Sequence, residues 1–443
     1  MNTPIIDFIE KLNSCNSVRL HMPGHKGKIG GAEGDITEIS GADSLFDADG
    51  IIDESERNLS TLYNTNFSLY STEGSTLAIK TMLALVYKYA KTKGGKPLVL
   101  ASRNAHSSFL FGVSSLNLDV QWIDEERENL FSSALNAVDI EKQLIKAQVK
   151  PTAVYLTSPD YLGNILPIKE ISKVCKKQGV LLVVDNAHGA YLNFLEENIH
   201  PINLGADMCC DSAHKTLPTL TGGGYLHVNK DFTAFKKCEV KRVMKTFAST
   251  SPSYLILSSL DFTNKYLSEN KTAFIDCAKK VGELKSFCEQ LGFKIIGQEQ
   301  LKITLDCKSY GYYGYEIAGA LEKQNIMVEY CDKDFVVLMF SPFNGEDDFT
   351  AFKTALKGIE RKKSLSHPSL RFTTPIKKMS VFDALFSREE KVDVKNAKGR
   401  IISSVNVSCP PAIPLIFSGE VVDDNVITVM EYYGIKECLV VKE

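Results

Sequence analysis

The sequence predicts an α/β fold built on a mixed, mostly parallel β-sheet flanked by helices, followed by smaller α+β domains. Three observations support this prediction. Short, nearly continuous apolar runs alternate with helical stretches between residues 54 and 264, which is the pattern of strands buried on both faces. Polar clusters directly follow several of these runs. After about residue 265 the alternation gives way to a compact α+β pattern.

The alternating region contains six predicted strands. They are expected at residues 97–101, 120–124, 152–157, 181–185, 206–210 and 223–228. Each is five or six residues long, mostly apolar and separated from the next by turn or helical signals. Helices are expected at residues 75–91 and 168–177, because apolar residues recur there at helical spacing. Together these elements define a large domain over residues 54–264.

Three smaller parts are predicted for the rest of the chain. Residues 1–53 are loop-rich, with glycines concentrated at 27–34, and form an N-terminal segment. Residues 265–361 form a small α+β domain, with strands at 293–296, 301–305 and 335–340 and a helix at 315–323. Residues 362–443 form a C-terminal domain that starts with a basic, Ser/Pro-containing linker, with helices near 380–386 and 424–433.

Composition excludes several classes of protein. The 443 residues are too many for one hydrophobic core. A net charge of −3 without a long basic run gives no electrostatic case for nucleic acid binding. No apolar run approaches the ~20 residues of a membrane span, and the first residues do not resemble a signal peptide. Eleven cysteines without a Cys-x-x-Cys motif are typical of a reducing cytoplasm.

One histidine pair has a spacing found in metal sites. His21 and His25 are four residues apart, which on a helix would place both side chains on one face. Pro23 and Gly24 lie between them and disfavour a helix. We therefore expect no metal.

Two polar clusters at strand ends carry the predicted chemistry. Asp185 ends one strand, and Lys215 follows the next strand along the chain, thirty residues later. An enzyme that uses pyridoxal phosphate needs an amine for the Schiff base and a carboxylate for the ring nitrogen. Ligands of parallel sheets bind beyond the carboxyl ends of the strands. The two residues are therefore predicted to share one cofactor site.

Neighbouring side chains complete this hypothesis. Ala187 is small enough to pack against the ring, and His188 would support Asp185 or the substrate. Ser212 would hold the phosphate, while His214 would contact the phosphate or act as a proton donor near the carbanion carbon. The alternatives are a strand-terminal aspartate that caps a turn and a lysine on the surface.

Three further segments contribute candidates. The start of the helix at 75–91 forms a phosphate cradle from Gly74, Ser75 and Thr76, although serine and threonine also cap helices that bind no ligand. A histidine after the strand at 97–101, His106, could lie flat on a pyridine ring or be an ordinary loop histidine. Asp160 and Tyr161 would lie near the cofactor hydroxyl or the substrate, or simply form a turn.

The motifs occur in an order that resembles a known family. They are His21-Met-Pro-Gly-His-Lys26, Gly74-Ser-Thr76, Arg103-Asn-Ala-His106, Asp185-x-Ala-His188, Ser212-x-His-Lys-Thr-Leu217, Ala397-x-Gly-Arg400, Pro410-Pro-Ala-Ile-Pro414 and Ser418-Gly-Glu420. Together they resemble the ornithine/lysine/arginine decarboxylases, a family of fold-type-I pyridoxal-phosphate enzymes. The resemblance covers nearly the whole chain and fits the short form of the family, which lacks an N-terminal receiver-like domain.

The resemblance implies a reaction and a role for each matching residue. The expected reaction is decarboxylation of arginine, lysine or ornithine, with a slight preference for the first two, to an amine of polyamine metabolism. Lys215 would be the Schiff-base lysine, Asp185 the partner of the pyridinium nitrogen, and Glu420 would lie near the distal amine of the substrate. The resemblance also implies that His106 stacks on the ring, that Ser75, Thr76, Ser212 and His214 surround the phosphate, and that a homodimer forms the active site at its interface.

Three departures from the family pattern leave the specificity open. Asn186 stands where the family often has glutamate, Gly222 where it often has glutamine, and Glu73 where asparagine is common. The alternatives are another reaction on the same scaffold, such as transamination or β-elimination, or a cofactor-binding regulator without activity. An aminotransferase usually needs an arginine for a carboxylate, and only Arg103 or Arg371 can be nominated. Retention of both Lys215 and Asp185 argues against an inactive regulator.

Overall fold

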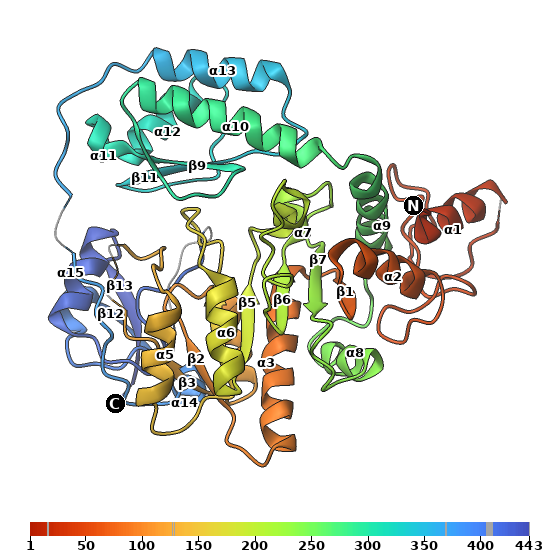
Figure 1. Ribbon diagram of the computed structural model, residues 1–443, viewed down its shortest axis with the longest axis horizontal. Coiled ribbons are helices and arrows are strands. Elements are labelled where there is room, and N and C mark those ends of the chain that lie inside the picture. The colour runs from red at the N-terminus through yellow and green to blue at the C-terminus, as the bar shows by residue number, and fades with distance from the viewer. Residues whose placement is uncertain (16, 126, 128, 368–369, 405–410, 443) are drawn as a thin grey trace. The chain divides into compact units, whose positions relative to one another are not determined.

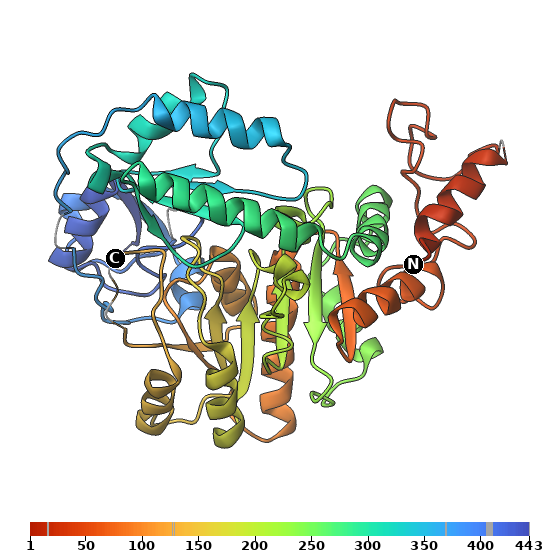
Figure 2. The same cartoon turned by 45° about the horizontal axis from the view of Figure 1, so that its top comes forward.

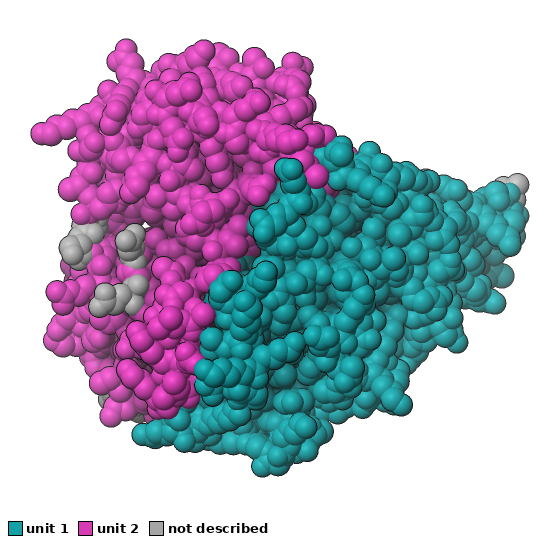
Figure 3. All heavy atoms as spheres, viewed as in Figure 1, with its two compact units in different colours: residues 1–99, 147–158, 168–272 teal, residues 100–146, 159–167, 273–443 magenta. Residues whose placement is uncertain are grey.

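The computed structural model describes residues 1–15, 17–125, 127, 129–367, 370–404 and 411–442. The chain forms two compact units, coloured separately in Figure 3. Unit 1 consists of residues 1–99, 147–158 and 168–272, and unit 2 of residues 100–146, 159–167 and 273–443. The division into four domains that the sequence suggests stays a prediction.

Unit 1 is built on a mixed sheet. Its strands lie in the order β1 (Phe67–Ser71), β7 (Gly224–Val228), β6 (Met208–Asp211), β5 (Leu181–Asp185), β4 (Ala153–Thr157) and β2 (Leu98–Ala101), whose first two residues belong to this unit. The β4–β5 and β5–β6 pairs are parallel, whereas β7 runs antiparallel to both of its neighbours. The predicted fold class is therefore confirmed, and four predicted strands match β4 to β7 within two residues at each end.

Helices cover the strands of unit 1 because those strands are apolar throughout. All five residues of β5 are buried, as are those of β4 and β7. Helix α3 (Gly74–Thr92) packs on β5, β6 and β7, and α6 (Ile168–Gln178) packs on β5. Figures 1 and 2 show α3 running along the strands. Each valine or leucine buried in this way stabilises the fold by about 1.5–3 kcal/mol.

The N-terminal segment is more helical than the sequence suggested. It contains α1 (Pro4–Ser14) and the start of α2 (Ile51–Tyr63). Thr3 provides no side-chain cap for α1. The buried carboxylate of Asp261, in α9 (Tyr254–Glu269), instead accepts the backbone N–H groups of Ile5 and Ile6 at 2.9 and 3.2 Å. Because this cap comes from a residue that is distant in the sequence, no local sequence pattern predicts it.

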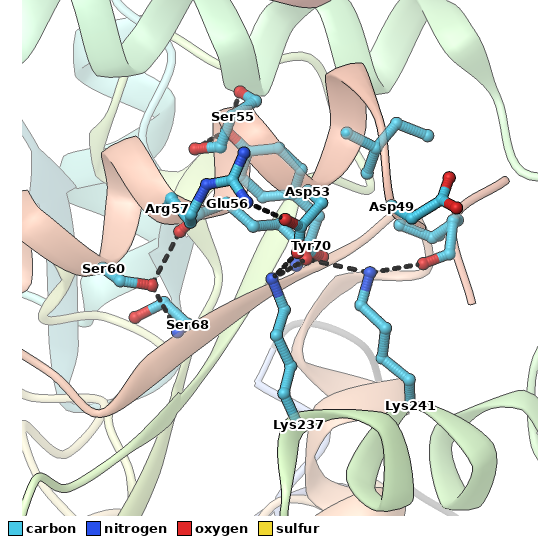
Figure 4. Close-up of polar contacts among 12 residues, drawn as sticks. Asp49, Asp53, Ser55, Glu56, Arg57, Ser60, Ser68, Tyr70, Lys237 and Lys241 are labelled. Carbon is cyan, nitrogen blue, oxygen red and sulfur yellow. Dashed lines mark hydrogen bonds and ion pairs between the residues drawn. The ribbon is translucent and has the colours of Figure 1, made fainter. Parts of the chain in front are cut away.

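A buried ion-pair cluster joins α2 to α8 (Lys237–Lys245), as Figure 4 shows. The Glu56 carboxylate is fully buried and lies 2.9 Å from the amines of both Lys237 and Lys241. Lys241 also donates a 2.7 Å hydrogen bond to the Leu45 carbonyl. Buried charges are tolerated only when they are paired, so this cluster fixes how α8 lies against the N-terminal segment.

Unit 2 contains two smaller sheets. The first is antiparallel, in the order β10 (Tyr330–Cys331), β11 (Phe335–Met339), β9 (Lys302–Asp306) and β8 (Lys294–Ile296). Helices α10 (Ala273–Gln290), α12 (Gly314–Glu322) and α13 (Glu346–Lys357) accompany it. The second sheet pairs β12 (Glu389–Asp393) with β13 (Glu437–Val441), close in sequence to α15 (Asp424–Tyr432).

Unit 2 also contains β3 (Asp119–Trp122), α4 (Ser107–Ser115) and α5 (Ala137–Lys146) from the middle of the chain. Its short helices include α11 (Cys307–Tyr310), η2 (Val394–Asn396) and α14 (Val381–Phe386), and α14 packs against α4. Within the described ranges, no helix combines the length and apolar character that a bilayer crossing requires.

Candidate active site

Asp185 lies at the carboxyl end of β5 and is almost completely buried. One carboxylate oxygen accepts a 3.1 Å hydrogen bond from the Tyr155 hydroxyl, and the other accepts the Ala187 backbone N–H at 3.1 Å. The Cys210 thiol lies 3.6 Å from that second oxygen. Burial, followed by the charge of Asp185, raises the pKa of Tyr155 well above its usual value, so the phenol remains a donor. These donors fix the orientation of the carboxylate.

Lys215 lies in the short helix α7 (Ala213–Thr216), directly after β6. Its amine is 3.1 Å from the Nε2 atom of His188, in the turn that follows β5. The neighbouring strands β5 and β6 are parallel, so their carboxyl ends bring these two side chains together. The structure thus unites the lysine and the histidine that the sequence predicted for one site.

The predicted phosphate cradle lies at the start of α3. Gly74 has a φ of +63° and donates its N–H to the Gly222 carbonyl at 2.6 Å. A Cβ at Gly224 would lie 2.9 Å from backbone atoms of both Gly74 and Asp211. Gly224 therefore allows β7, β6 and the start of α3 to approach closely.

Hydroxyl and imidazole groups surround the start of α3. The hydroxyl groups of Ser75 and Ser212 are 2.8 Å apart, and the half-buried Thr76 follows in the first turn. The His214 Nδ1 atom donates to the Gly223 carbonyl at 2.8 Å, and burial lowers the pKa of the imidazole. A neutral ring with its proton on Nδ1 presents Nε2 as an acceptor. His214 is therefore poised to accept a proton.

Glu73, the other departure near the cradle, is the N-cap residue of α3 but makes no capping hydrogen bond with its side chain. Its carboxylate instead accepts the Ser249 backbone N–H at 2.7 Å. Glu73 thereby holds the loop before α9 against the start of α3.

His106 belongs to unit 2, where it is the N-cap residue of α4 and its Nδ1 atom accepts the Ser108 N–H at 3.1 Å. The neighbouring Ser107 donates its N–H to the Ala412 carbonyl at 2.8 Å. This capping fixes the ring orientation. The stacking role of His106 stays a prediction.

Asp160 and Tyr161 also lie in unit 2. The Asp160 carboxylate accepts hydrogen bonds from the Leu162 and Asn164 N–H groups, from the Asn164 amide and from the Ser133 N–H. Burial raises its pKa to about 6 despite these bonds. The Tyr161 hydroxyl donates to Glu329 at 3.1 Å. This geometry supports the turn alternative for Asp160, and a substrate contact from either residue stays a prediction.

Glu420 forms a buried bidentate ion pair with Arg103. Two guanidinium nitrogens approach its two oxygens at 2.6 and 2.9 Å, and one oxygen also accepts the Phe417 N–H at 2.9 Å. The Arg103 guanidinium lies 4.6 Å from the Phe417 ring centroid. Both side chains are at most 3% exposed. Glu420 therefore anchors the loop that leads to His106, and its predicted contact with the substrate amine stays a prediction.

Replacing Glu420 by alanine should lower the stability of unit 2 strongly. The change leaves the Arg103 guanidinium buried without its carboxylate, which typically costs about 3–5 kcal/mol. Thermal melting measures the loss. Glu437→Ala is the matched control, because its ion pair with Lys391 is exposed and such pairs contribute about 0–1 kcal/mol. Equal melting temperatures for the two variants would contradict the anchoring role.

Sequence reasoning missed several polar residues behind the site. Tyr155, a donor to Asp185, lies within an apolar strand and looks like a core residue. Asp211, His200 and His227 form a fully buried cluster on the opposite face of β6 from Cys210. Alternating strand geometry predicts that Asp211 and Cys210 face opposite sides, but which partners meet there depends on the fold.

Comparison with known proteins identifies the family. The major-domain model of the Orn/Lys/Arg decarboxylases matches residues 30–304, and the C-terminal-domain model of the same family matches residues 372–439. The chain belongs to the Orn/Lys/Arg decarboxylase family. This is a family of pyridoxal-phosphate enzymes of fold type I. The membership confirms the predicted enzyme class, a decarboxylase of a basic amino acid, and does not favour the alternative reactions.

Relatives match over almost their full length. The chain is 27% identical to the uncharacterized protein YaaO of Bacillus subtilis, over 95% of this chain and 92% of the relative. It is 25% identical to an arginine decarboxylase of the same organism, over 96% and 92% of the two chains. The lysine decarboxylase LdcF of Francisella novicida superimposes with a TM-score of 0.83 at 15% identity, over 99% of this chain and 81% of the other. This last likeness concerns the fold alone.

Proposed function

We propose that the residues of unit 1 bind pyridoxal phosphate, with Lys215 as its covalent anchor. Three features support the fit. Asp185 offers a buried, oriented carboxylate for the ring nitrogen. The first turn of α3 offers backbone N–H groups with no partner inside the helix, together with the paired hydroxyls of Ser75 and Ser212. Ala187 has no bulky side chain to obstruct a ring beside Asp185.

When bound, pyridoxal phosphate supplies the electron sink that receives the electron pair left by departing carbon dioxide. The protein supplies orientation and proton transfer. Asp185 would hold a proton on the ring nitrogen of the bound cofactor, and His188 positions the Lys215 amine through their 3.1 Å contact. Lys215, or His214 once it has taken up a proton on Nε2, would give the substrate α-carbon the proton that replaces carbon dioxide. His106 is proposed to lie against the ring.

Arginine is the proposed substrate. Four of the similar proteins, from Bacillus subtilis, Bacillus anthracis, Bacillus cereus and Halalkalibacterium halodurans, are arginine decarboxylases, and each matches at least 94% of this chain. Identity is 24–25%, so lysine and ornithine remain competing substrates. The observation that carries the proposal is the convergence of Lys215, His188 and Asp185 at the ends of β5 and β6 in a chain of this family.

The proposed setting is cytoplasmic, and the proposed assembly is a homodimer with the active site at its interface. The cytoplasmic setting is supported by the eleven cysteines without a Cys-x-x-Cys motif, and the homodimer by the resemblance to fold-type-I enzymes. The product, agmatine from arginine, would enter polyamine metabolism.

Peptide mapping tests the proposed anchor directly. The protein is incubated with pyridoxal phosphate, reduced with borohydride, digested and examined by mass spectrometry. The proposal predicts the pyridoxyl mass on the peptide that contains Lys215. A label spread over exposed lysines such as Lys230, with Lys215 unmodified, would contradict it.

A further inference from the structure

A buried polar cluster lies directly behind the candidate site and takes no part in the proposed chemistry. Its centre is the carboxylate of Asp211, the last residue of β6 and the residue before Ser212. The Nε2 atoms of His200 and His227 lie 3.0 and 3.1 Å from one Asp211 oxygen. The Asn186 side-chain amide donates to the other oxygen at 2.7 Å. All four side chains are fully buried.

Hydrogen bonds define the proton positions in this cluster. The His200 Nδ1 atom accepts the Ile202 N–H at 3.3 Å, which favours the neutral tautomer with its proton on Nε2, next to Asp211. The Asn186 amide nitrogen also lies 3.0 Å from this Nε2 atom, so Asn186 contacts both His200 and Asp211. The His227 Nδ1 atom lies 2.7 Å from the Ser68 hydroxyl, which can donate to it, so His227 also presents Nε2–H to Asp211. Burial alone would raise the pKa of Asp211, but the two histidines hold it well below its usual range. Three N–H groups thus surround one carboxylate.

Asn186 connects this carboxylate to the candidate site. It follows Asp185 in the sequence, and Asp211 precedes Ser212. Backbone bonds join the same strand ends, from the Asn186 N–H to the Cys210 carbonyl at 3.0 Å and from the Ser212 N–H to the Ala187 carbonyl at 3.3 Å. The side-chain bridge therefore ties the segment that carries Asp185 to the segment that carries Lys215.

We propose that Asn186 is a positioning residue whose amide, bonded to the buried carboxylate of Asp211, fixes the spacing between Asp185 and Lys215. The bridge itself stands on the structure, whereas its role in cofactor binding rests on the proposed function. A carboxylate of the same shape at position 186 would meet a second buried carboxylate at the present 2.7 Å separation, and two such groups cannot both ionise at low cost. This gives a local reason for asparagine at a position where the family often has glutamate.

The isosteric substitution Asn186→Asp tests the bridge. The titratable members of the cluster are Asp211, His200 and His227, and the titratable groups that face it are Cys209, Tyr63 and Tyr225. Asp185 lies on the opposite side, next to Cys210. The repulsion raises the pKa of the new carboxyl in the folded state above its unfolded value of ~3.9. Destabilisation is therefore small at low pH and grows as pH rises through the folded-state pKa.

The expected result for the cofactor-free protein is a melting temperature at pH 8 at least about 5 °C below wild type. This deficit should fall by about half or more at pH 5.5, because the two carboxyls then share a proton. Equal melting temperatures at pH 8, or a deficit that does not change with pH, would overturn the proposal.

The double variant N186D/D211N provides a sharper test, because it exchanges amide and carboxylate without changing either shape. The amide placed at position 211 would donate to the carboxylate placed at position 186, and the carbonyl oxygen of that amide would accept from His200 and His227. The second substitution should therefore restore most of the melting temperature lost at pH 8. Asn264→Asp is the control, since Asn264 is also fully buried but donates to the Ser55 carbonyl and the Tyr70 hydroxyl. D211N must rescue N186D and must not rescue N264D.

A cofactor titration separates the bridge from its proposed role. N186D at pH 8 should bind pyridoxal phosphate at least about tenfold more weakly than wild type and shift the absorbance of the bound cofactor, and N186D/D211N should recover both. Normal binding and an unchanged spectrum in N186D would overturn the positioning role, even if the melting results support the bridge. If wild type itself binds no pyridoxal phosphate, the proposed function fails. The melting temperatures still test whether the hydrogen bond between Asn186 and Asp211 stabilises the protein.

Metal analysis examines a competing explanation of the cluster. Donor atoms of His200, Cys209 and Asp211 lie within 4.8 Å of one another, a separation compatible with a bound ion. The hydrogen bonds described above satisfy His200 and Asp211 without one. Stoichiometric zinc in the purified protein, with a melting temperature that falls on chelation, would overturn the carboxylate–amide account.

Discussion

Lys215→Ala is expected to abolish nearly all decarboxylation, with a loss of at least about 10³-fold in kcat. Without its amine the protein has neither the covalent anchor for pyridoxal phosphate nor a principal donor of the proton that replaces carbon dioxide. Turnover is measured as amine released from arginine, and anchoring as the absorbance of bound cofactor. Both should be lost together.

The control for this variant is Lys230→Ala, which removes an exposed lysine that follows the carboxyl end of β7. It should keep the turnover and the absorbance of wild type. Melting temperatures of the cofactor-free proteins show whether Lys215→Ala still folds. Decarboxylation at the wild-type rate by a folded Lys215→Ala protein would remove Lys215 from its assigned role.

Asp185→Ala is expected to reduce kcat by about 10²–10³-fold, the range seen when one oriented electrostatic group is removed from an active site. The carboxylate is held by Tyr155, Ala187 and Cys210, so its orientation toward a ring nitrogen is set before any ligand binds. Cofactor affinity should fall as well, which a titration of the cofactor-free protein measures.

Tyr155→Phe is the matched test of that orientation. It removes one donor to Asp185 and leaves the strand apolar, so a smaller loss of kcat is expected than for Asp185→Ala. A larger loss for Tyr155→Phe, or no loss for Asp185→Ala, would contradict the assignment of the carboxylate to the ring nitrogen.

Local patterns predicted the strands that form the site because those strands are buried on both faces. Strand β5 matches its predicted limits, and β4, β6 and β7 differ by at most two residues at each end. Strand β1 was missed because its buried serines, Ser68 and Ser71, interrupt the apolar pattern. Helix α1 was missed because its capping carboxylate, Asp261, lies far along the chain.

The residues of the candidate site also fall into a group that the sequence could predict and a group that it could not. Lys215, His188 and Asp185 could be predicted because each follows or ends a strand, and the parallel pairing of β5 and β6 brings their ends together. The partners of Glu420 and Asp160 could not be predicted. Arg103 is over three hundred residues from Glu420 in the sequence, and the hydrogen bonds of Asp160 depend on the exact path of a turn. The bridge between Asn186 and Asp211 likewise exists only through strand pairing.

The most direct test of the central claim is an amine-product measurement. Purified protein with pyridoxal phosphate is mixed separately with arginine, lysine and ornithine, and the products are identified by mass. The account predicts agmatine from arginine, and carbon dioxide in equal amount. Cadaverine or putrescine as the main product would support decarboxylation but identify lysine or ornithine as the substrate. No amine from any of the three, in a protein that holds its cofactor on Lys215, would contradict the account.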